Sequence, residues 1–108
     1  MNTKPEQVRQ ITSHHHFVLL TSEVEVHLRF AEDKFPLWPK DLLHGDAIIN
    51  EEKGEATQAA IDNVWGRDLT LAKYRTELMQ TAAMCIRQMA YIDQYCGYAS
   101  TEDADASN

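Results

Sequence analysis

Residues 68–97, DLTLAKYRTELMQTAAMCIRQMAYIDQYCG, carry the longest regular apolar pattern in the chain and decide its fold class. Apolar side chains recur there at three- and four-residue steps, which is the spacing of one face of an α-helix. The positions that follow this period include Leu71, Leu78, Ala82, Ile86, Met89 and Ile92. Asp68 is a favourable N-cap and Gly97 a favourable C-terminal stop, so the pattern predicts a helix over residues 68–96.

Upstream of this stretch, the segment between Pro5 and Pro36 contains no other Pro or Gly. Apolar residues repeat through it at a similar helical period, although Ser22 and Glu23 interrupt the pattern. The repeating positions are Val8, Ile11, His15, Leu19, Val26 and Phe30. We therefore expect this segment to be mainly helical, with these residues on its apolar face.

A connection at residues 36–40 contains two prolines and leads to Asp41, where a second helical segment starts. This segment ends at Gly66 and is rich in Ile and Ala. Gly45 lies near its beginning and is a poor helix former, so we expect the helix itself to start at about Asp46.

No segment sustains the alternation typical of a β-strand, so the sequence predicts an all-α fold with three main long helices per chain. We expect one domain over residues 1–99 and an acidic tail at residues 100–108, whose small polar composition is typical of disorder. A helix over residues 68–96 is roughly 43 Å long, whereas a compact chain of this length is about 30 Å across. Because such a helix extends beyond its own domain, we expect a second copy to complete a four-helix-type bundle, as a homodimer or a dimer of dimers.

Charge and hydropathy exclude several classes of function. The chain has 10 Lys and Arg against 17 Asp and Glu, and its formal net charge of −7 argues against non-specific binding to nucleic acid or to anionic membranes. Its apolar runs are far shorter than the roughly 20 residues of a membrane helix, and its N-terminus has no signal-peptide pattern. Cys85 and Cys96 are too far apart in one helix to form a disulfide. These features are typical of a cytoplasmic protein with reduced thiols.

Residues 51–55, Glu-Glu-Lys-Gly-Glu, break two local rules of helix stability at one place. Glu52 and Glu55 are three residues apart and share a helix face, where like charges repel each other. Gly54 costs about 1 kcal/mol relative to Ala in a helix interior. A solvated acidic face is the simple interpretation in a chain with 17 acidic residues. Local conflicts of this kind also gather at functional sites.

The apolar residues around this cluster favour a functional interpretation. Residues 48–49 and 56–60 are mostly apolar, so the carboxylates border a stripe where their charge is costly unless a cation neutralises it. Glu77 lies at the edge of the apolar face of the last predicted helix, and two antiparallel helices can bring it to Glu52 and Glu55. Oxygen ligands with room for water and phosphate suit Mg²⁺.

This pattern resembles that of the MazG-like all-α nucleoside triphosphate pyrophosphohydrolases, a family related to dimeric dUTPases and dCTP pyrophosphatases. The family signature is Glu-Glu-x-x-Glu on one helix and Glu-x-x-Asp on the next. Residues 51–55 match the first half, and Glu77 begins the second half after the 21 residues from 56 to 76. The family's Asp falls at Gln80, whose amide oxygen can bind Mg²⁺ but brings no charge. The resemblance covers roughly residues 36–95.

The resemblance implies Mg²⁺-dependent hydrolysis of a (deoxy)nucleoside triphosphate to the monophosphate and pyrophosphate, with nucleotide-pool house-cleaning as the purpose. It implies that Mg²⁺, or alternatively Mn²⁺, is held by Glu52, Glu55 and Glu77, with Gln80 as a weak fourth ligand. Glu51 would then either support the ligands without touching the metal or act as the base that orients the attacking water. These four glutamates are the catalytic set that the resemblance implies.

The sequence offers four candidates for binding the substrate, which are Trp38, Lys40, Lys73 and Gln80. Trp38 precedes the helix that carries residues 51–55, where the family uses aromatic residues to stack a base, and core packing is an equally good interpretation. Lys73 shares a helix face with Glu77 at four-residue spacing. A solvated surface cation is the alternative interpretation of Lys40 and Lys73.

Two other classes of function remain open. Gln80 favours a non-catalytic helical module that binds a nucleotide or a protein partner on a decayed MazG-like scaffold. A purely structural, coiled-coil-like dimer is the third alternative, and it predicts that Glu55→Ala or Glu77→Ala stabilises the fold without changing any activity.

Overall fold

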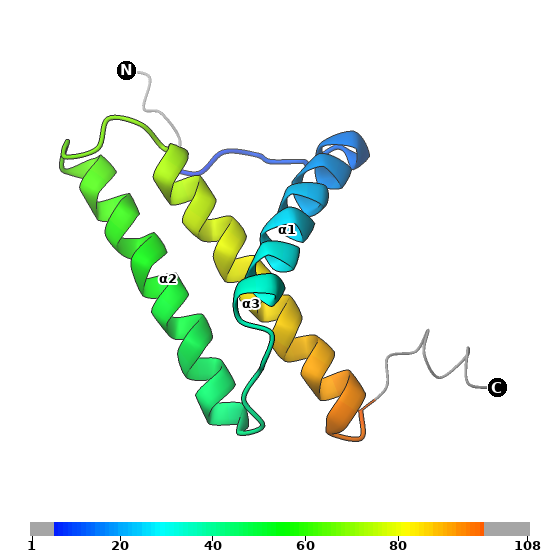
Figure 1. The fold of residues 1–108 in the computed structure, drawn as a ribbon. Helices are drawn as coiled ribbons and strands as arrows, with labels where there is room; N and C mark the ends of the chain where they lie inside the picture. Colours follow the sequence, from blue (N-terminus) through cyan, green and yellow to red (C-terminus); the bar gives the residue numbers. More distant parts are fainter. Residues whose placement is uncertain (1–5, 99–108) are drawn as a thin grey trace, which may run out of the picture.

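The computed structural model describes residues 6–98, and these residues form three α-helices. The helices are α1 (His14–Lys34), α2 (Leu42–Val64) and α3 (Ala72–Tyr95), as Figure 1 shows. No strand occurs in the described part of the chain, so the predicted all-α fold with three long helices is confirmed. The acidic tail predicted at residues 100–108 lies outside the described residues. Among the three described helices, none has both the length and the apolar content needed to cross a membrane.

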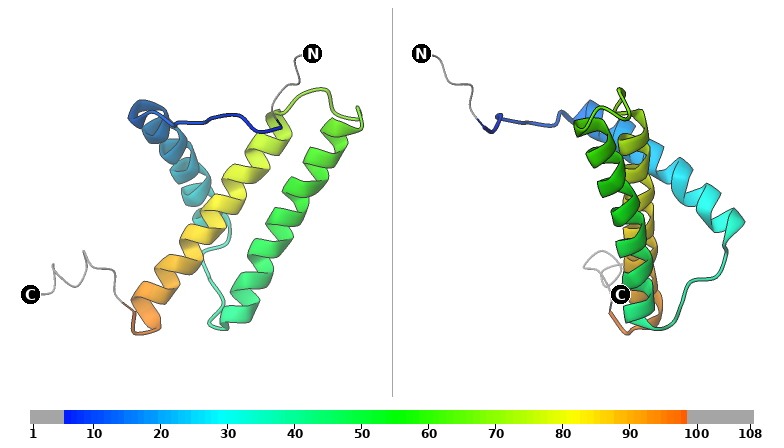
Figure 2. Two further views of the ribbon diagram at one scale, coloured as in Figure 1. Left: turned by 180° about the vertical axis from the view of Figure 1, so that it is seen from behind. Right: turned by 90° about the vertical axis from the view of Figure 1, so that its left-hand side faces the viewer.

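Helix α3 is the central element of the fold. Helix α2 runs antiparallel beside it, and α1 crosses it at an angle (Figures 1 and 2). Both α1 and α2 pack on α3, whereas over residues 6–98 the backbones of α1 and α2 do not approach each other. The position of every functional side chain on α1 or α2 is therefore set by how that helix packs on α3.

The two interfaces with α3 are formed by small and flexible side chains. Ala56 and Ala59 of α2 are almost completely buried. On α3, Ala83 and Met84 form a buried cluster with Leu28 of α1. Small side chains at such positions allow two helix axes to approach closely, and Met adapts to irregular gaps.

The apolar face predicted for the first helix is not the face that packs on α3. Leu19, Val26 and Phe30 are 50%, 68% and 69% exposed, whereas Leu28 makes the buried contact. Helix α1 is therefore apolar on two sides. Within residues 6–98, the side that contains Leu28 is covered by α3 and the other side is exposed. Helical periodicity reveals an apolar stripe but not which stripe meets a neighbouring helix.

Helix α1 is also shorter than its segment predicted. It begins at His14, after Ser13, whose side-chain oxygen accepts the backbone N–H of His16. Val8 and Ile11 lie outside the helix and are exposed. The N-cap fixes this start because Ser satisfies a backbone donor that would otherwise lack a partner.

Helix α3 begins at Ala72, so the predicted N-cap at Asp68 was wrong. The Asp68 carboxylate instead accepts the backbone N–H and the hydroxyl of Thr70, which stabilises a turn before the helix. At the other end, Gly97 has a φ of +76°, the left-handed conformation expected of a C-terminal stop. Cys85 and Cys96 are both free thiols.

Helix α2 begins at Leu42 and not near Asp46, because the Asp41 carboxylate caps its first turn. Such a cap contributes about 1 kcal/mol and offsets the cost of Gly45. The glycine is buried, and a Cβ at this position would collide with the side-chain amide of Gln88 on α3. A side chain at position 45 would therefore displace the Gln88 amide from its contacts with Trp38 and with the carbonyl of Leu42.

Replacing each of the two glycines of α2 by alanine should have opposite effects on stability. A Cβ at Gly54 would meet no atom within 4 Å. We expect Gly54→Ala to raise the free energy of unfolding by about 0.5–1 kcal/mol, because Gly is a poor helix former. Gly45→Ala is the matched comparison and should lower the free energy of unfolding, because the new Cβ collides with the Gln88 amide. Urea denaturation of both variants tests this, and a loss of stability in Gly54→Ala would contradict the account.

Candidate metal centre

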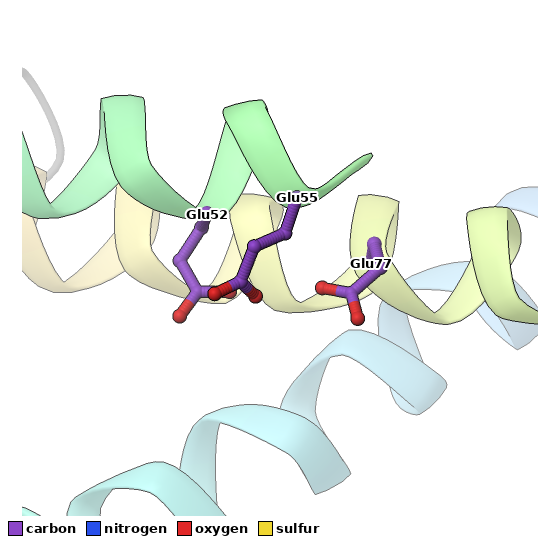
Figure 3. Close-up of side chains that lie close together, drawn as sticks. All are labelled: Glu52, Glu55 and Glu77. Carbon is purple, nitrogen blue, oxygen red and sulfur yellow. The ribbon is translucent and has the colours of Figure 1, made fainter. Parts of the chain in front are cut away.

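Three carboxylates converge on one side of the α2–α3 pair. Glu52 and Glu55 come from adjacent turns of α2, and Glu77 comes from the neighbouring turn of α3 (Figure 3). Each side chain offers one oxygen, and these three oxygens all lie within 4.8 Å of one another. The antiparallel packing of the two helices thus produces the grouping that the sequence predicted.

The three carboxylates have little internal compensation for their charge. Within residues 6–98, no basic side chain forms an ion pair with any of them. One oxygen of Glu52 and one of Glu77 are buried and accept no hydrogen bond. Because buried, unpartnered oxygens are costly, the site is complementary to a cation.

The titration of these groups reflects the same environment. Burial raises the pKa of the Glu52 carboxyl above its ordinary value, and the charges of Glu55, Glu77 and Glu51 raise it further. Burial is also the main cause of the raised pKa of Glu77, followed by the charge of Glu55 and a hydrogen bond between these two carboxyls. The nearby ammonium group of Lys73 acts in the opposite direction on Glu77.

A cavity of about 220 Å³ adjoins the carboxylates. Glu52 and Gln80 both line it, so Gln80, which the resemblance implies as a weak fourth ligand, shares a cavity with one of the three carboxylates. The other walls come from α1, from the residue that follows it and from α3, and they are formed by His27, Phe30, Ala31, Lys34, Phe35, Ala83, Met84 and Arg87. Carboxylate and amide oxygens next to an open space suit a hard cation that keeps part of its water shell.

Glu51 and Lys73 are exposed and lie at the periphery of this centre. Glu51 is not one of the three converging carboxylates, although its charge is close enough to raise the pKa of Glu52. Lys73 is close enough to Glu77 to lower its pKa, as its position one turn earlier on α3 predicted.

Trp38 and Lys40 line a different, larger cavity of about 640 Å³, at the C-terminal half of α3. The indole N–H of Trp38 donates to Gln88 at 2.8 Å, and the backbone carbonyl of Lys40 accepts from the Tyr91 hydroxyl at 2.8 Å. These two predicted substrate-binding residues therefore line a different cavity from Glu52, and Trp38 also packs against the buried cluster of Leu28, Ala83 and Met84.

The sequence interpretation missed Arg87, which lines both cavities. Its guanidinium lies 4.8 Å from the centre of the Trp38 ring, and it donates to the backbone carbonyl of Phe35 at 2.7 Å. A charged residue on the otherwise apolar face of α3 that contains Met79, Ala83 and Met84 was the available signal. Lys34 and His27 were missed as well, because their relevance depends on how α1 crosses α3.

Comparison with known proteins gives no assignment: no protein-family model, curated protein or solved structure matches this chain.

The uncompensated carboxylates predict a coupling between metal, pH and stability. The pKa values of Glu52 and Glu77 are raised in the folded protein. Ionising these two carboxyls therefore lowers the free energy of unfolding. In metal-free buffer, we therefore expect the Tm to rise as the pH falls from neutral toward the ordinary glutamate pKa of 4.5. Adding Mg²⁺ at pH 7 should raise the Tm, and Glu52→Gln should raise the metal-free Tm while abolishing the Mg²⁺ effect.

Thermal unfolding followed by circular dichroism measures both effects. Asp33→Asn is the matched control, because Asp33 is an exposed acid of α1 outside the cluster. An Mg²⁺-dependent rise in Tm that persists in Glu52→Gln but disappears in Asp33→Asn would contradict the assignment of the site.

Proposed function

We propose that this protein is a Mg²⁺-dependent nucleoside triphosphate pyrophosphohydrolase of the MazG-like type. It would convert a (deoxy)nucleoside triphosphate and water to the monophosphate and pyrophosphate. The observation that carries the proposal is the convergence of Glu52, Glu55 and Glu77 within 4.8 Å, with buried oxygens that have no partner. The spacing of these residues, their distribution over two antiparallel helices and the adjoining cavity all support it.

Each residue has a distinct role in this proposal. Glu52, Glu55 and Glu77 would hold the metal, and Gln80 would contribute a neutral oxygen from the neighbouring wall of the cavity. When bound, Mg²⁺ supplies charge neutralisation and orientation of the phosphates, and lowers the pKa of a bound water. Glu51 is the candidate for orienting the attacking water, because it lies near enough to affect the titration of Glu52. Burial of Glu52 and Glu77 limits competing contacts with solvent.

The proposal includes a homodimer or a dimer of dimers. Leu19, Val26 and Phe30 form an exposed apolar stripe on α1, and no large side chain within residues 6–98 is fully buried. A second copy that covers this stripe would supply the hydrophobic burial that one chain lacks. Light scattering of the full chain should give at least twice the 12.4 kDa of one chain, and a value of 12.4 kDa would contradict this part of the proposal.

Activity assays test the proposed reaction. With Mg²⁺ and a panel of nucleoside and deoxynucleoside triphosphates, we expect pyrophosphate and the matching monophosphate as products. Glu55→Gln or Glu77→Gln should lower kcat/KM by more than about 100-fold, because the loss of a metal ligand exceeds the 10–100-fold typical of an outer-shell partner. Asp33→Asn should leave kcat/KM unchanged. No turnover of any nucleotide, together with no heat on Mg²⁺ titration, would contradict the proposal.

A second candidate function is a non-catalytic module that binds a nucleotide or a protein partner. Gln80 favours it, because this residue lies in the cavity beside Glu52 without the charge of the family's Asp. Gln80→Asp discriminates between the two functions. A large gain in hydrolysis would indicate a decayed site, whereas a loss would show that the amide belongs to a working variant of the site. Measuring kcat and Mg²⁺ affinity in this variant tests both outcomes.

A further inference from the structure

Arg87 is a buried cation that lacks an acidic partner. Its residue is only 9% exposed, and across residues 6–98 it forms no ion pair. A guanidinium carries five N–H donors and a permanent positive charge. From the described part of the chain, one hydrogen bond, to the Phe35 carbonyl, and the stacking on Trp38 are the only compensation for this charge. Burying a charge with so little compensation is unfavourable unless something else neutralises it.

The position of Arg87 brings it toward the carboxylates. It lines the cavity of about 220 Å³ together with Glu52 and Gln80. Ten residues separate it from Glu77 on α3, which is about 15 Å of helix. Long side chains on a helix lean toward its N-terminus, which for α3 is the end nearer Glu77.

Opposite charges therefore face the same cavity without pairing. Within residues 6–98, Glu52 lines one side and has one buried oxygen without a hydrogen-bond partner, and Arg87, Lys34 and His27 supply basic groups from α3 and α1. A bare metal ion would satisfy only the carboxylates, and a bare anion would satisfy only the basic groups. A phosphate chain that carries a divalent cation satisfies both.

We propose that Arg87 binds phosphate oxygens of the metal-bound polyphosphate, and that Lys34 assists it from α1. This inference rests on the proposed function for the nature of the ligand. Arg is suited to the role because its planar fork can donate two parallel hydrogen bonds to a phosphate. The contact with Trp38 gives the binding event an optical signal, because a phosphate bound to Arg87 changes the surroundings of the indole ring.

The alternative is that Arg87 only fastens the connection at residues 35–40 to α3. Binding of pyrophosphate distinguishes the two roles, because a fastening role does not require an anion. Trp38 and Trp65 are the two tryptophans of the chain, so Trp65→Phe leaves Trp38 as the sole fluorophore. In this background, pyrophosphate with Mn²⁺ should change the Trp38 emission and give a dissociation constant. The absence of any pyrophosphate binding with Mn²⁺ present would overturn the inference.

The variants at Arg87 complete the test. Arg87→Met should weaken pyrophosphate binding by about tenfold or more, while the affinity for Mn²⁺ alone is retained. Lys53→Met is the matched control, because Lys53 is an exposed cation of α2 that contacts Thr57 outside the cavity, and it should bind pyrophosphate as the parent does. Equal affinity in Arg87→Met and the parent would overturn the inference.

If Arg87→Met does not fold, Arg87→Lys takes its place. It keeps the charge but loses the fork geometry, so a severalfold weaker affinity is expected and an unchanged affinity would overturn the inference. The result is separable from the proposed function. Arg87-dependent pyrophosphate binding without nucleotide hydrolysis would reject the function and keep the inference. Hydrolysis with an unchanged KM in Arg87→Met would keep the proposed function and reject the inference about Arg87.

Discussion

The close antiparallel contact between α2 and α3 is the constraint on which the rest of the structure depends. Ala56 and Ala59 keep the two helices close, and Gly45 allows the side chain of Gln88 to pack on the first turn of α2. Gln88 then links three segments, because it accepts from Trp38 and donates to the carbonyl of Leu42. This network fixes the register of α2 on α3. The register in turn decides which carboxylates meet.

The same register leaves acidic and basic groups near one another that, within residues 6–98, form no ion pair. Glu52 and Glu77 hold buried oxygens without partners, and Arg87 holds a buried charge without an acid. Water compensates exposed charges, and a few of them also form ion pairs, as Arg75 and Glu23 do at 2.7 Å. Glu52 and Arg87 differ from these because they are partly or largely buried, and both line one cavity between the helices. A ligand that carries both a metal ion and phosphate would compensate both the acidic and the basic groups, and this is the physical basis of the proposed function.

The parts of the molecule that follow from local spacing could be predicted from the sequence. The three helices and the meeting of Glu52, Glu55 and Glu77 follow from helical periodicity and antiparallel packing. Details at helix ends were less predictable, because side-chain caps compete with intrinsic propensity. Asp41 therefore outweighs the glycine that follows it, whereas Asp68 stabilises a turn in place of the helix.

Features that depend on tertiary geometry could not be predicted. The face of α1 that packs on α3 is set by a crossing angle that no sequence period encodes, so a different apolar stripe is exposed. Trp38 lies close to the predicted metal helix in sequence, yet it packs on the buried cluster of Leu28, Ala83 and Met84 and lines a different cavity from Glu52. Arg87 can be identified as a candidate phosphate-binding residue only from its burial and from the absence of an acidic partner within residues 6–98.

The central claim is that Glu52, Glu55 and Glu77 hold one divalent cation. Crystals of the full chain soaked in Mn²⁺ test it most directly, through the anomalous scattering of the metal. Binding at this site should give a strong anomalous peak between these three side chains, with carboxylate oxygens at about 2 Å from it. A crystal in which Mn²⁺ binds elsewhere, with no peak at the three glutamates, would contradict the account.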